Sequence, residues 1–248
     1  INMPNRSPSP FWKITLSAFV ISLIMGSFYL YRWYRQQGYR SRRLLAWLRQ
    51  PEKHPEWAIT AKQRCGEASF LLPTDGYIGF LWGDSFRPGH THQGVDIFTS
   101  AGAGEIPVYA AYGGYLTRLE DWKSSLIIRI PQDPLQPERQ IWTYYTHLAD
   151  AQGNSFIVKD FPRGTREVYV EEGTLLGYQG NYSGNPGNPT GVHLHFSIVK
   201  DDGAGHFLNE RRINNTLDPS PYLGLSLNAS ENQGQIPVCP PPERKTYE

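Results

Sequence analysis

The sequence predicts an all-β domain preceded by one N-terminal transmembrane helix, and three observations support this fold class. Gly accounts for 24 and Pro for 20 of the 248 residues, a turn-rich composition that argues against a helical bundle. Aromatic residues make up 13% of the chain, which argues against disorder because disordered chains lack the side chains that fill a core. Between about residues 66 and 225, short runs of β-branched and aromatic residues alternate with turn signals.

An uncharged, mostly apolar run follows a Pro- and Ser-rich start. Residues 1–10 are predicted to be disordered. No residue from Ile14 to Leu30 is charged, and a helix of this length measures about 26 Å, slightly less than the roughly 30 Å hydrocarbon core of a bilayer. With its aromatic flanks, the run predicts a transmembrane signal anchor over residues 11–34. A cleaved signal peptide and a buried core helix are the alternatives, although Tyr and Arg stand where a cleavage site requires small residues.

The charges beside the apolar run bear on its orientation. Arg6 and Lys13 precede the run. Five arginines follow it: Arg32, Arg35, Arg40, Arg42 and Arg43. Taken alone, the positive-inside rule therefore places the C-terminal bulk of the chain in the cytoplasm.

The rest of the chain divides into three parts by composition. Residues 35–65 are predicted to form a juxtamembrane linker with a short helix that ends at Pro51. Residues 66–225 are predicted to form a single β domain, and residues 226–248 a polar, Pro-rich tail.

Net charge and cysteine content exclude two classes of protein. The formal net charge of +1 argues against a nucleic-acid binder, which relies on a basic surplus to neutralise phosphates. Two cysteines cannot make a four-cysteine zinc site. Cys65 and Cys239 lie at the two ends of the β region. They are either two unrelated thiols or a disulfide that ties those ends together.

Most of the functional information lies in three histidine-containing clusters. These clusters are His92-Gln93-Gly94-Val95-Asp96, Tyr144-Tyr145-Thr146-His147-Leu148 and His193-Leu194-His195-Phe196. Side chains alternate between faces along a strand, so His193 and His195 point to the same side. His92 and Asp96 share a face if their segment is extended throughout. Each pair can therefore converge on one small ion.

These residue types suit a catalytic zinc site. Zinc binds imidazole nitrogen and carboxylate oxygen, and two histidines with one carboxylate leave a fourth position open for water, whose pKa zinc lowers to about 7. Surplus imidazoles can then act as general base, general acid or oxyanion stabiliser. Each cluster alone is weak, since Gly94 could serve only a turn, but their joint occurrence in a turn-rich β chain is a much stronger signal. His90 could line the same cleft, whereas His54 and His206 are expected in surface loops.

In these motifs the chain resembles the lysostaphin-like (LytM-type) zinc metallopeptidases, which cut peptidoglycan peptides. The matching segments are His92 to Asp96, Pro107 to Gly114, Tyr145 to Leu148 and Thr190 to Phe196. The resemblance runs from about Gly76 to Val199, roughly half of the chain. It implies a twisted antiparallel β-sandwich with an open groove.

The resemblance also implies a role for each motif residue. His92, Asp96 and His195 would be the ligands of a Zn²⁺ cofactor, and His147 and His193 the catalytic histidines. Three departures from the family pattern are visible. Phe86 lies where a tyrosine is often found, which leaves Tyr112, Tyr144 and Tyr145 as candidates for its role. The loop from Gly180 to Gly191 is slightly long, and Ser197 stands where an acidic residue is common.

The resulting expectation is a membrane-anchored zinc metalloendopeptidase, a peptidoglycan hydrolase that cuts stem peptides or cross-bridges. The alternatives are a catalytically silent peptidoglycan-binding module or activator of another hydrolase, and a zinc hydrolase of a different peptide or ester. The expected partners are peptidoglycan peptides and, through the N-terminal helix, a membrane. No nucleic acid is expected and no protein partner is identifiable. Peptidoglycan lies outside the cytoplasmic membrane, so the expected location is the cell membrane, single-pass, with the catalytic domain on its periplasmic or extracellular side, against the arginine count.

Overall fold

We describe the fold from a computed structural model, which describes residues 10–85 and 89–240 and, within the N-terminal helix, no side chains for residues 10–13 and 32–37. Most of the predicted disordered N-terminus and Phe86 therefore lie outside the described residues, as do the side chains of Arg32 and Arg35. The chain divides into two compact units, residues 1–39 and residues 40–248, which we take one at a time.

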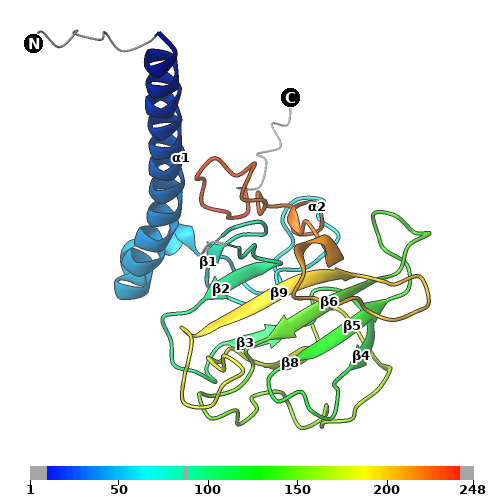
Figure 1. Cartoon of the computed structure of the whole chain (residues 1–248). Helices are drawn as coiled ribbons and strands as arrows, with labels where there is room; N and C mark the ends of the chain where they lie inside the picture. The colour runs from blue at the N-terminus through cyan, green and yellow to red at the C-terminus, as the bar shows by residue number, and fades with distance from the viewer. Residues whose placement is uncertain (1–9, 86–88, 241–248) are drawn as a thin grey trace, which may run out of the picture. The chain divides into compact units, whose positions relative to one another are not determined.

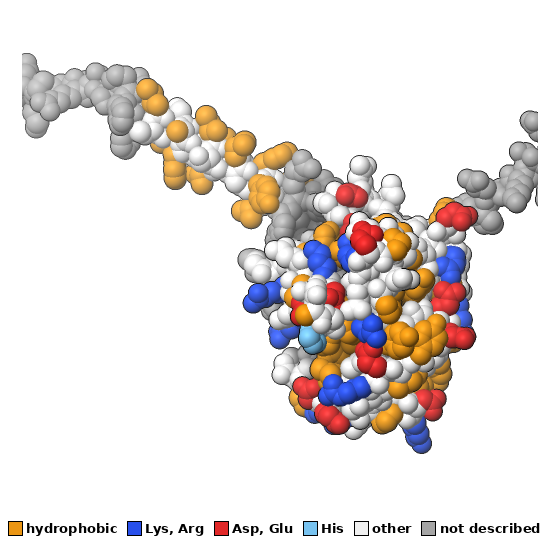
Figure 2. Space-filling model, turned by 90° about the vertical axis from the view of Figure 1, so that its right-hand side faces the viewer, with side chains coloured by type: hydrophobic (Ala, Val, Ile, Leu, Met, Phe, Trp, Pro, Cys, Tyr) orange, Lys and Arg blue, Asp and Glu red, His pale blue; other side chains and the backbone are white. Residues whose placement is uncertain are grey.

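The described part of the first unit is helical. It belongs to helix α1 (Pro10–Arg49), whose window Ile14–Tyr31 has a mean hydropathy of 1.8 and no buried residue. Figure 2 shows hydrophobic side chains along this part of the helix. The window is long and apolar enough to cross a membrane, and a signal sequence near the N-terminus has the same features.

The second unit begins with the last ten residues of α1, so the short helix expected in the linker continues the N-terminal one. The helix ends at Arg49, directly before Gln50 and Pro51, since proline lacks the N–H that a continuing helix needs. Leu44 and Trp47 are buried in a cluster with Tyr77 and Phe98. Two short 3-10 turns follow: η1 (Pro51–Lys53) and η2 (Pro55–Trp57).

The body of the second unit is antiparallel β-structure (Figure 1). One eight-stranded sheet has the order β1-β2-β9-β6-β5-β4-β7, with β10 paired to β9, and β3 pairs with β8 in a second, two-stranded sheet. The strands of the large sheet are β1 (Tyr77–Phe80), β2 (Val95–Phe98), β4 (Gly114–Thr117), β5 (Leu126–Ile130), β6 (Ile141–Thr146), β7 (Val168–Val170), β9 (His193–Lys200) and β10 (Thr216–Leu217). The remaining elements are β3 (Pro107–Tyr109), β8 (Leu175–Tyr178), η3 (Ile213–Asn215) and α2 (Ser220–Leu223). A mostly antiparallel β fold with one N-terminal apolar helix is thereby confirmed.

Alternation along the central strand β9 separates the core from the functional face of the sheet. Leu194, Phe196 and Ile198 are fully buried in the main hydrophobic core, and burying each of these side chains stabilises the fold by about 1.5–3 kcal/mol. His193 and His195 occupy the alternate positions and so point to the opposite face. The sheet therefore has one apolar face and one face that carries polar side chains in this region.

The C-terminal tail is fastened to the domain. Cys239 forms a disulfide with Cys65 across 174 residues of sequence, so the pairing that the sequence left open is present. Upstream of the disulfide, the Trp82 N–H donates to the Leu227 carbonyl at 3.0 Å, and the Ala229 N–H donates to the Trp82 carbonyl at 2.8 Å. The described part of the tail thus runs beside the chain just after strand β1.

Gly94 allows β2 to approach β9. A Cβ atom at Gly94 would lie 2.2 Å from the Phe196 carbonyl oxygen, a separation that no side chain can tolerate. Val95 is paired with Phe196 in the adjoining register. The glycine is therefore required for close strand contact and not only for a turn.

We predict that the Cys239→Ser variant is less stable than the parent protein. Loss of a native disulfide that closes a long loop typically costs about 2–5 kcal/mol, because the unfolded chain regains freedom. Denaturant titration under oxidising conditions measures the difference. The same midpoint for both proteins, or for the parent with and without reductant, would contradict this expectation.

We predict that Gly94→Ala lowers the free energy of unfolding by about 1–3 kcal/mol, as overpacking in a tightly packed region does. Gly191→Ala is the matched control, because its added Cβ would meet only the Phe98 ring, at 3.4 Å. Thermal or denaturant unfolding of the two variants provides the comparison. Equal stability losses would show that the contact between Gly94 and Phe196 is not the constraint.

Candidate functional site

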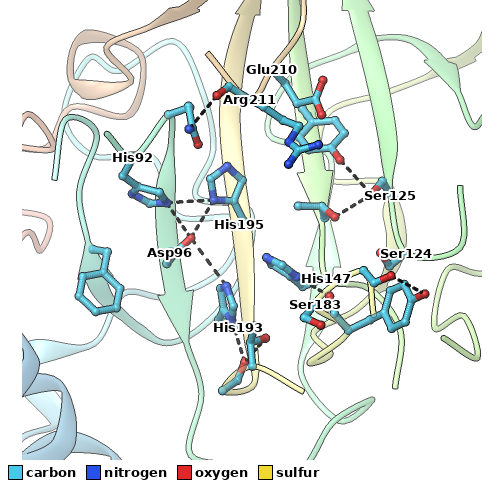
Figure 3. A pocket seen from close by; sticks show the side chains of 18 of the residues that line it. His92, Asp96, Ser124, Ser125, His147, Ser183, His193, His195, Glu210 and Arg211 are labelled. Atoms are coloured by element: carbon cyan, nitrogen blue, oxygen red, sulfur yellow. Dashed lines mark hydrogen bonds and ion pairs between the residues drawn. The ribbon is translucent and has the colours of Figure 1, made fainter. Parts of the chain in front are cut away.

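Strand pairing on both sides of β9 assembles the site. Asp96 of β2 lies directly opposite His195 of β9. On the other side of β9, Thr146 of β6 lies opposite the same residue, and His147 follows immediately after β6 ends. Residues from three distant parts of the sequence therefore meet around the first residues of β9 (Figure 3).

Three of the predicted site residues converge at atomic contact distance. The Asp96 Oδ1 atom lies 3.1 Å from His92 Nε2 and 2.8 Å from His195 Nδ1. The two imidazole nitrogens lie 3.0 Å apart. Within the described ranges 10–85 and 89–240, this is the group of His, Cys, Asp and Glu residues whose geometry could hold a metal ion, and all three residues are buried.

His92 reaches this group from a loop, because β2 begins only at Val95. Its Nδ1 atom lies 2.9 Å from the Leu81 carbonyl oxygen. A carbonyl oxygen can only accept, so Nδ1 carries the proton and Nε2 presents a lone pair toward Asp96 and His195. A backbone acceptor behind a histidine ligand is the usual means of fixing its tautomer and orientation.

The pKa shifts of Asp96 and His195 favour a bound cation. Burial raises the pKa of Asp96, but its electrostatic interactions with His92 and His193, together with the hydrogen bonds to His195 and His92, outweigh burial and bring it well below its usual range. Burial lowers the pKa of His195. Burial also lowers the pKa of His92, but the Asp96 carboxylate outweighs burial and raises it overall. A charged carboxylate and imidazole lone pairs are the forms that bind a metal. The shifts of Asp96 and His195 favour these forms, whereas a metal has to compete with a proton at His92.

The donor set fits a divalent ion of the zinc type. One carboxylate oxygen and two imidazole nitrogens are zinc ligands, and three protein ligands are typical of catalytic rather than structural zinc sites. The sulfur atoms of Cys65 and Cys239 are not available to such a site, because they are joined in the disulfide. The residues present therefore suit the metal that the sequence motifs imply.

His147 and His193 form a second imidazole pair beside the first group. Their ring centroids are 4.3 Å apart. His193 Nδ1 donates to the Gly191 carbonyl at 2.7 Å and His147 Nδ1 donates to the Tyr182 carbonyl at 2.6 Å. Each ring thus has its proton on Nδ1 and a lone pair on Nε2. Burial, together with the electrostatic interaction with His147, lowers the pKa of His193 to about 3, so the His193 ring is neutral.

The backbone at His147 is unusual. Its φ angle is 72°, in the left-handed region that residues with a Cβ seldom adopt. Such backbone strain is concentrated at functional sites, where the surrounding structure holds it in place. With His147 in place, the structure brings together all five site residues predicted from the sequence: His92, Asp96, His147, His193 and His195.

A pocket of about 840 Å³ surrounds these five residues. His90 lines it, as anticipated, whereas His54 and His206 do not. Among the three tyrosine candidates, Tyr144 lines the pocket and its hydroxyl donates to Ser125 Oγ at 3.0 Å. The other two lie elsewhere: the Tyr145 hydroxyl accepts the Ala111 N–H at 2.9 Å, and Tyr112 packs against Phe70.

Several lining residues were missed by sequence reasoning: Gln93, Ser124, Ser125, Tyr182, Asn185, Glu210 and Arg211. All seven lie outside the named strands, where no spacing rule identifies a side chain that faces a site. A usable signal existed only for Gln93, which lies inside the first histidine motif, and for Tyr182 and Asn185, which lie in the Gly- and Asn-rich loop.

No family model and no curated protein matches this chain. Among solved structures, the catalytic domain of the antimicrobial peptidase lysostaphin from Staphylococcus simulans is 22% identical over 59% of this chain and 90% of that domain, with a TM-score of 0.38. A putative peptidase M23 from Pseudomonas aeruginosa is 22% identical over 75% of this chain and 61% of that chain, with a TM-score of 0.36. Csd3 from Helicobacter pylori is 17% identical over 62% of this chain and 34% of that chain, with a TM-score of 0.38.

Full-length lysostaphin is matched over 55% of its length, so the chain spans about half of that protein. A putative glycyl-glycine endopeptidase lytM from Ruminococcus gnavus is 24% identical over 59% of this chain and 49% of that chain, with a TM-score of 0.34. The chemistry of the site rests on the five residues themselves. The solved structures to which this chain is similar include lysostaphin, lytM and M23 peptidase domains, the group that its motifs resemble.

Proposed function

We propose that this chain is a zinc metalloendopeptidase of the lysostaphin-like type that hydrolyses peptide bonds in peptidoglycan. The observation that carries the proposal is the convergence of His92, Asp96 and His195 on one point, with His147 and His193 beside them in the same pocket. A metal-binding group alone would fit many roles. The adjoining pair of imidazoles, with lone pairs available on Nε2, favours hydrolysis.

In this proposal His92 Nε2, Asp96 Oδ1 and His195 Nδ1 hold the zinc ion. When bound, zinc supplies a Lewis acid for the scissile carbonyl and lowers the pKa of a coordinated water. The Leu81 carbonyl orients the His92 ring so that its Nε2 lone pair would be available to the ion. The site is buried, which strengthens its electrostatic interactions relative to those in water.

His147 and His193 handle the proton. Because Nδ1 of each ring is committed to a backbone carbonyl, the Nε2 atom is the one that can accept a proton from the attacking water. A ring protonated at Nε2 can then donate to the leaving amine nitrogen or to the oxygen that gains negative charge. Two rings 4.3 Å apart allow one to accept while the other stabilises charge.

The pocket suits a peptide substrate. Its lining includes Phe98, Gly191, Ser125 and Tyr144, and it includes hydroxyl and amide groups that can hydrogen-bond to a peptide backbone. We take this pocket as part of the open groove of a twisted β-sandwich. Extended stem peptides or cross-bridges of peptidoglycan fit the shape and chemistry expected of its substrate.

Residues 11–34 of the proposed enzyme form a single-pass membrane anchor, and residues 35–65 a juxtamembrane linker. The domain over residues 66–225 then acts on the periplasmic or extracellular side, with residues 226–248 as its tail. The apolar window of α1 supports the anchor. Peptidoglycan as substrate requires this side of the membrane, because it lies outside the cytoplasm.

A catalytically silent peptidoglycan-binding module is the second candidate. Loss of a ligand or of a catalytic histidine would favour it, and all five positions are filled here. An active endopeptidase is therefore better supported than a silent binding module.

We predict that the purified protein holds about one zinc ion per chain and releases peptide-cleaved fragments from peptidoglycan. His195→Ala abolishes both properties, because it removes one of three ligands. Metal analysis and mass spectrometry of fragments from peptidoglycan of known composition measure the two properties, and the fragments identify the bond that is cut. Chelation should stop the release of fragments and added zinc should restore it. A parent protein without stoichiometric zinc would overturn the proposal.

We predict that His193→Ala retains zinc but lowers kcat by about 10²–10⁴-fold, the usual contribution of a positioned general acid or base. His206→Ala is the matched control, because this exposed histidine lies outside the pocket and its side chain pairs with Asp202. Steady-state digestion of a peptidoglycan peptide, with zinc content measured in parallel, tests whether the variant loses turnover while it keeps zinc. A His193→Ala variant with parental turnover would exclude His193 from proton transfer.

A further inference from the structure

The final turns of α1, from Arg40 onward, contact the loop that carries His92. This contact belongs to the second compact unit, which begins at Arg40. Resting on the function proposed above, we propose that Arg40 is a positioning residue for the metal centre, acting on His92 through Asp84.

The first step is an ion pair inside the protein. Arg40 Nη1 lies 3.3 Å from Asp84 Oδ2. The exposed fractions of the two residues are 9% and 6%, so both charges have lost most of their water. A buried charge without its partner is strongly unfavourable, so Asp84 is held beside the helix.

The second step leads from Asp84 to His92 through backbone groups. The Asp84 carboxylate accepts the Leu81 N–H at 2.7 Å, which closes a tight turn between the two residues. The Asp84 carbonyl accepts the His92 N–H at 2.7 Å, and the Gly83 N–H donates to the His92 carbonyl at 2.8 Å. The Leu81 carbonyl accepts His92 Nδ1 at 2.9 Å. The turn therefore holds both the backbone and the ring of the ligand.

The same helix segment also supports the other side of the site. Leu44 and Trp47 are buried against Tyr77 and Phe98. The Phe98 ring stacks on the His193 ring, with centroids 4.7 Å apart and planes inclined by 20°. The segment thus lies behind both a proposed ligand and a proposed catalytic histidine, which gives the proposal a second, independent contact.

If the ion pair between Arg40 and Asp84 only stabilised the fold, its loss would lower stability without a specific effect on zinc affinity. Another buried carboxylate, Asp133, is paired with Arg139, whose Nε donates to it at 2.8 Å. Arg139 lies just before the start of β6, whereas His147 follows its end. Removing either arginine should lower stability. Only the loss of Arg40 should also weaken zinc binding.

The experiment compares full-length Arg40→Gln, Arg40→Lys and Arg139→Gln proteins in detergent. The zinc dissociation constant is measured by competition with a chelator, below the unfolding temperature of each metal-free variant. Arg40→Gln should weaken zinc binding about tenfold or more, since loss of support behind a metal ligand typically costs 10–100-fold. Arg40→Lys, which keeps the charge, should recover part of the affinity and also covers the case in which Arg40→Gln does not fold. Arg139→Gln should remain within about twofold of the parent, as expected for a site without shared contacts.

A double-mutant cycle and a spectroscopic measurement test the route. Asp84→Asn should weaken zinc binding, and Arg40→Gln added to it should cause little further loss, because both act on the same turn. The absorption spectrum of the Co²⁺-loaded Arg40→Gln protein should differ from that of the parent, reporting altered ligand geometry. Parental zinc affinity in Arg40→Gln overturns the inference and leaves the proposed function intact. Additive losses in the cycle overturn the route through Asp84. Absence of zinc binding in the parent overturns the proposed function and the inference together.

Discussion

The register of β2 on β9 is the constraint on which the site depends. It sets Asp96 opposite His195, and it is possible only because Gly94 lets the backbone approach the Phe196 carbonyl. A shift of one residue would turn one member of the pair to the apolar face, since side chains alternate along a strand. Strand pairing across the core therefore fixes the distance between two groups that lie 99 residues apart in sequence.

The group of buried ionisable side chains is costly for the fold. Burial of His193, His195 and Asp96 each disfavours the charged form. The Gly191 carbonyl accepts a hydrogen bond from His193 Nδ1, and the Leu81 carbonyl accepts one from His92 Nδ1. These hydrogen bonds limit the free-energy cost of burying the two rings. The remaining imidazole nitrogens surround the Asp96 carboxylate, and a bound cation would stabilise this arrangement. The polar composition of this face therefore carries a stability cost that function explains better than folding does.

Much of this arrangement could be predicted from the sequence. Alternation placed His193 and His195 on one face, and the motifs identified all five residues that the structure brings together. The partners behind them could not be predicted, because the carbonyls of Leu81 and Tyr182 come from loops without a spacing rule. The same limit applies to Gly94, whose role depends on a strand that is distant in sequence.

The two histidines outside regular strands show where the site is most vulnerable. Strands β2 and β9 fix Asp96, His193 and His195 through ladder hydrogen bonds, whereas His92 and His147 lie in loops. The backbone of His147 is held by close packing against Gly180, since a Cβ at Gly180 would lie 2.4 Å from the His147 carbonyl oxygen. At His92 the turn closed by Asp84 does the same. Loop residues can sample alternatives that strand residues cannot, so once the sheet register has placed Asp96, His193 and His195, the precision of the site depends on these two supports.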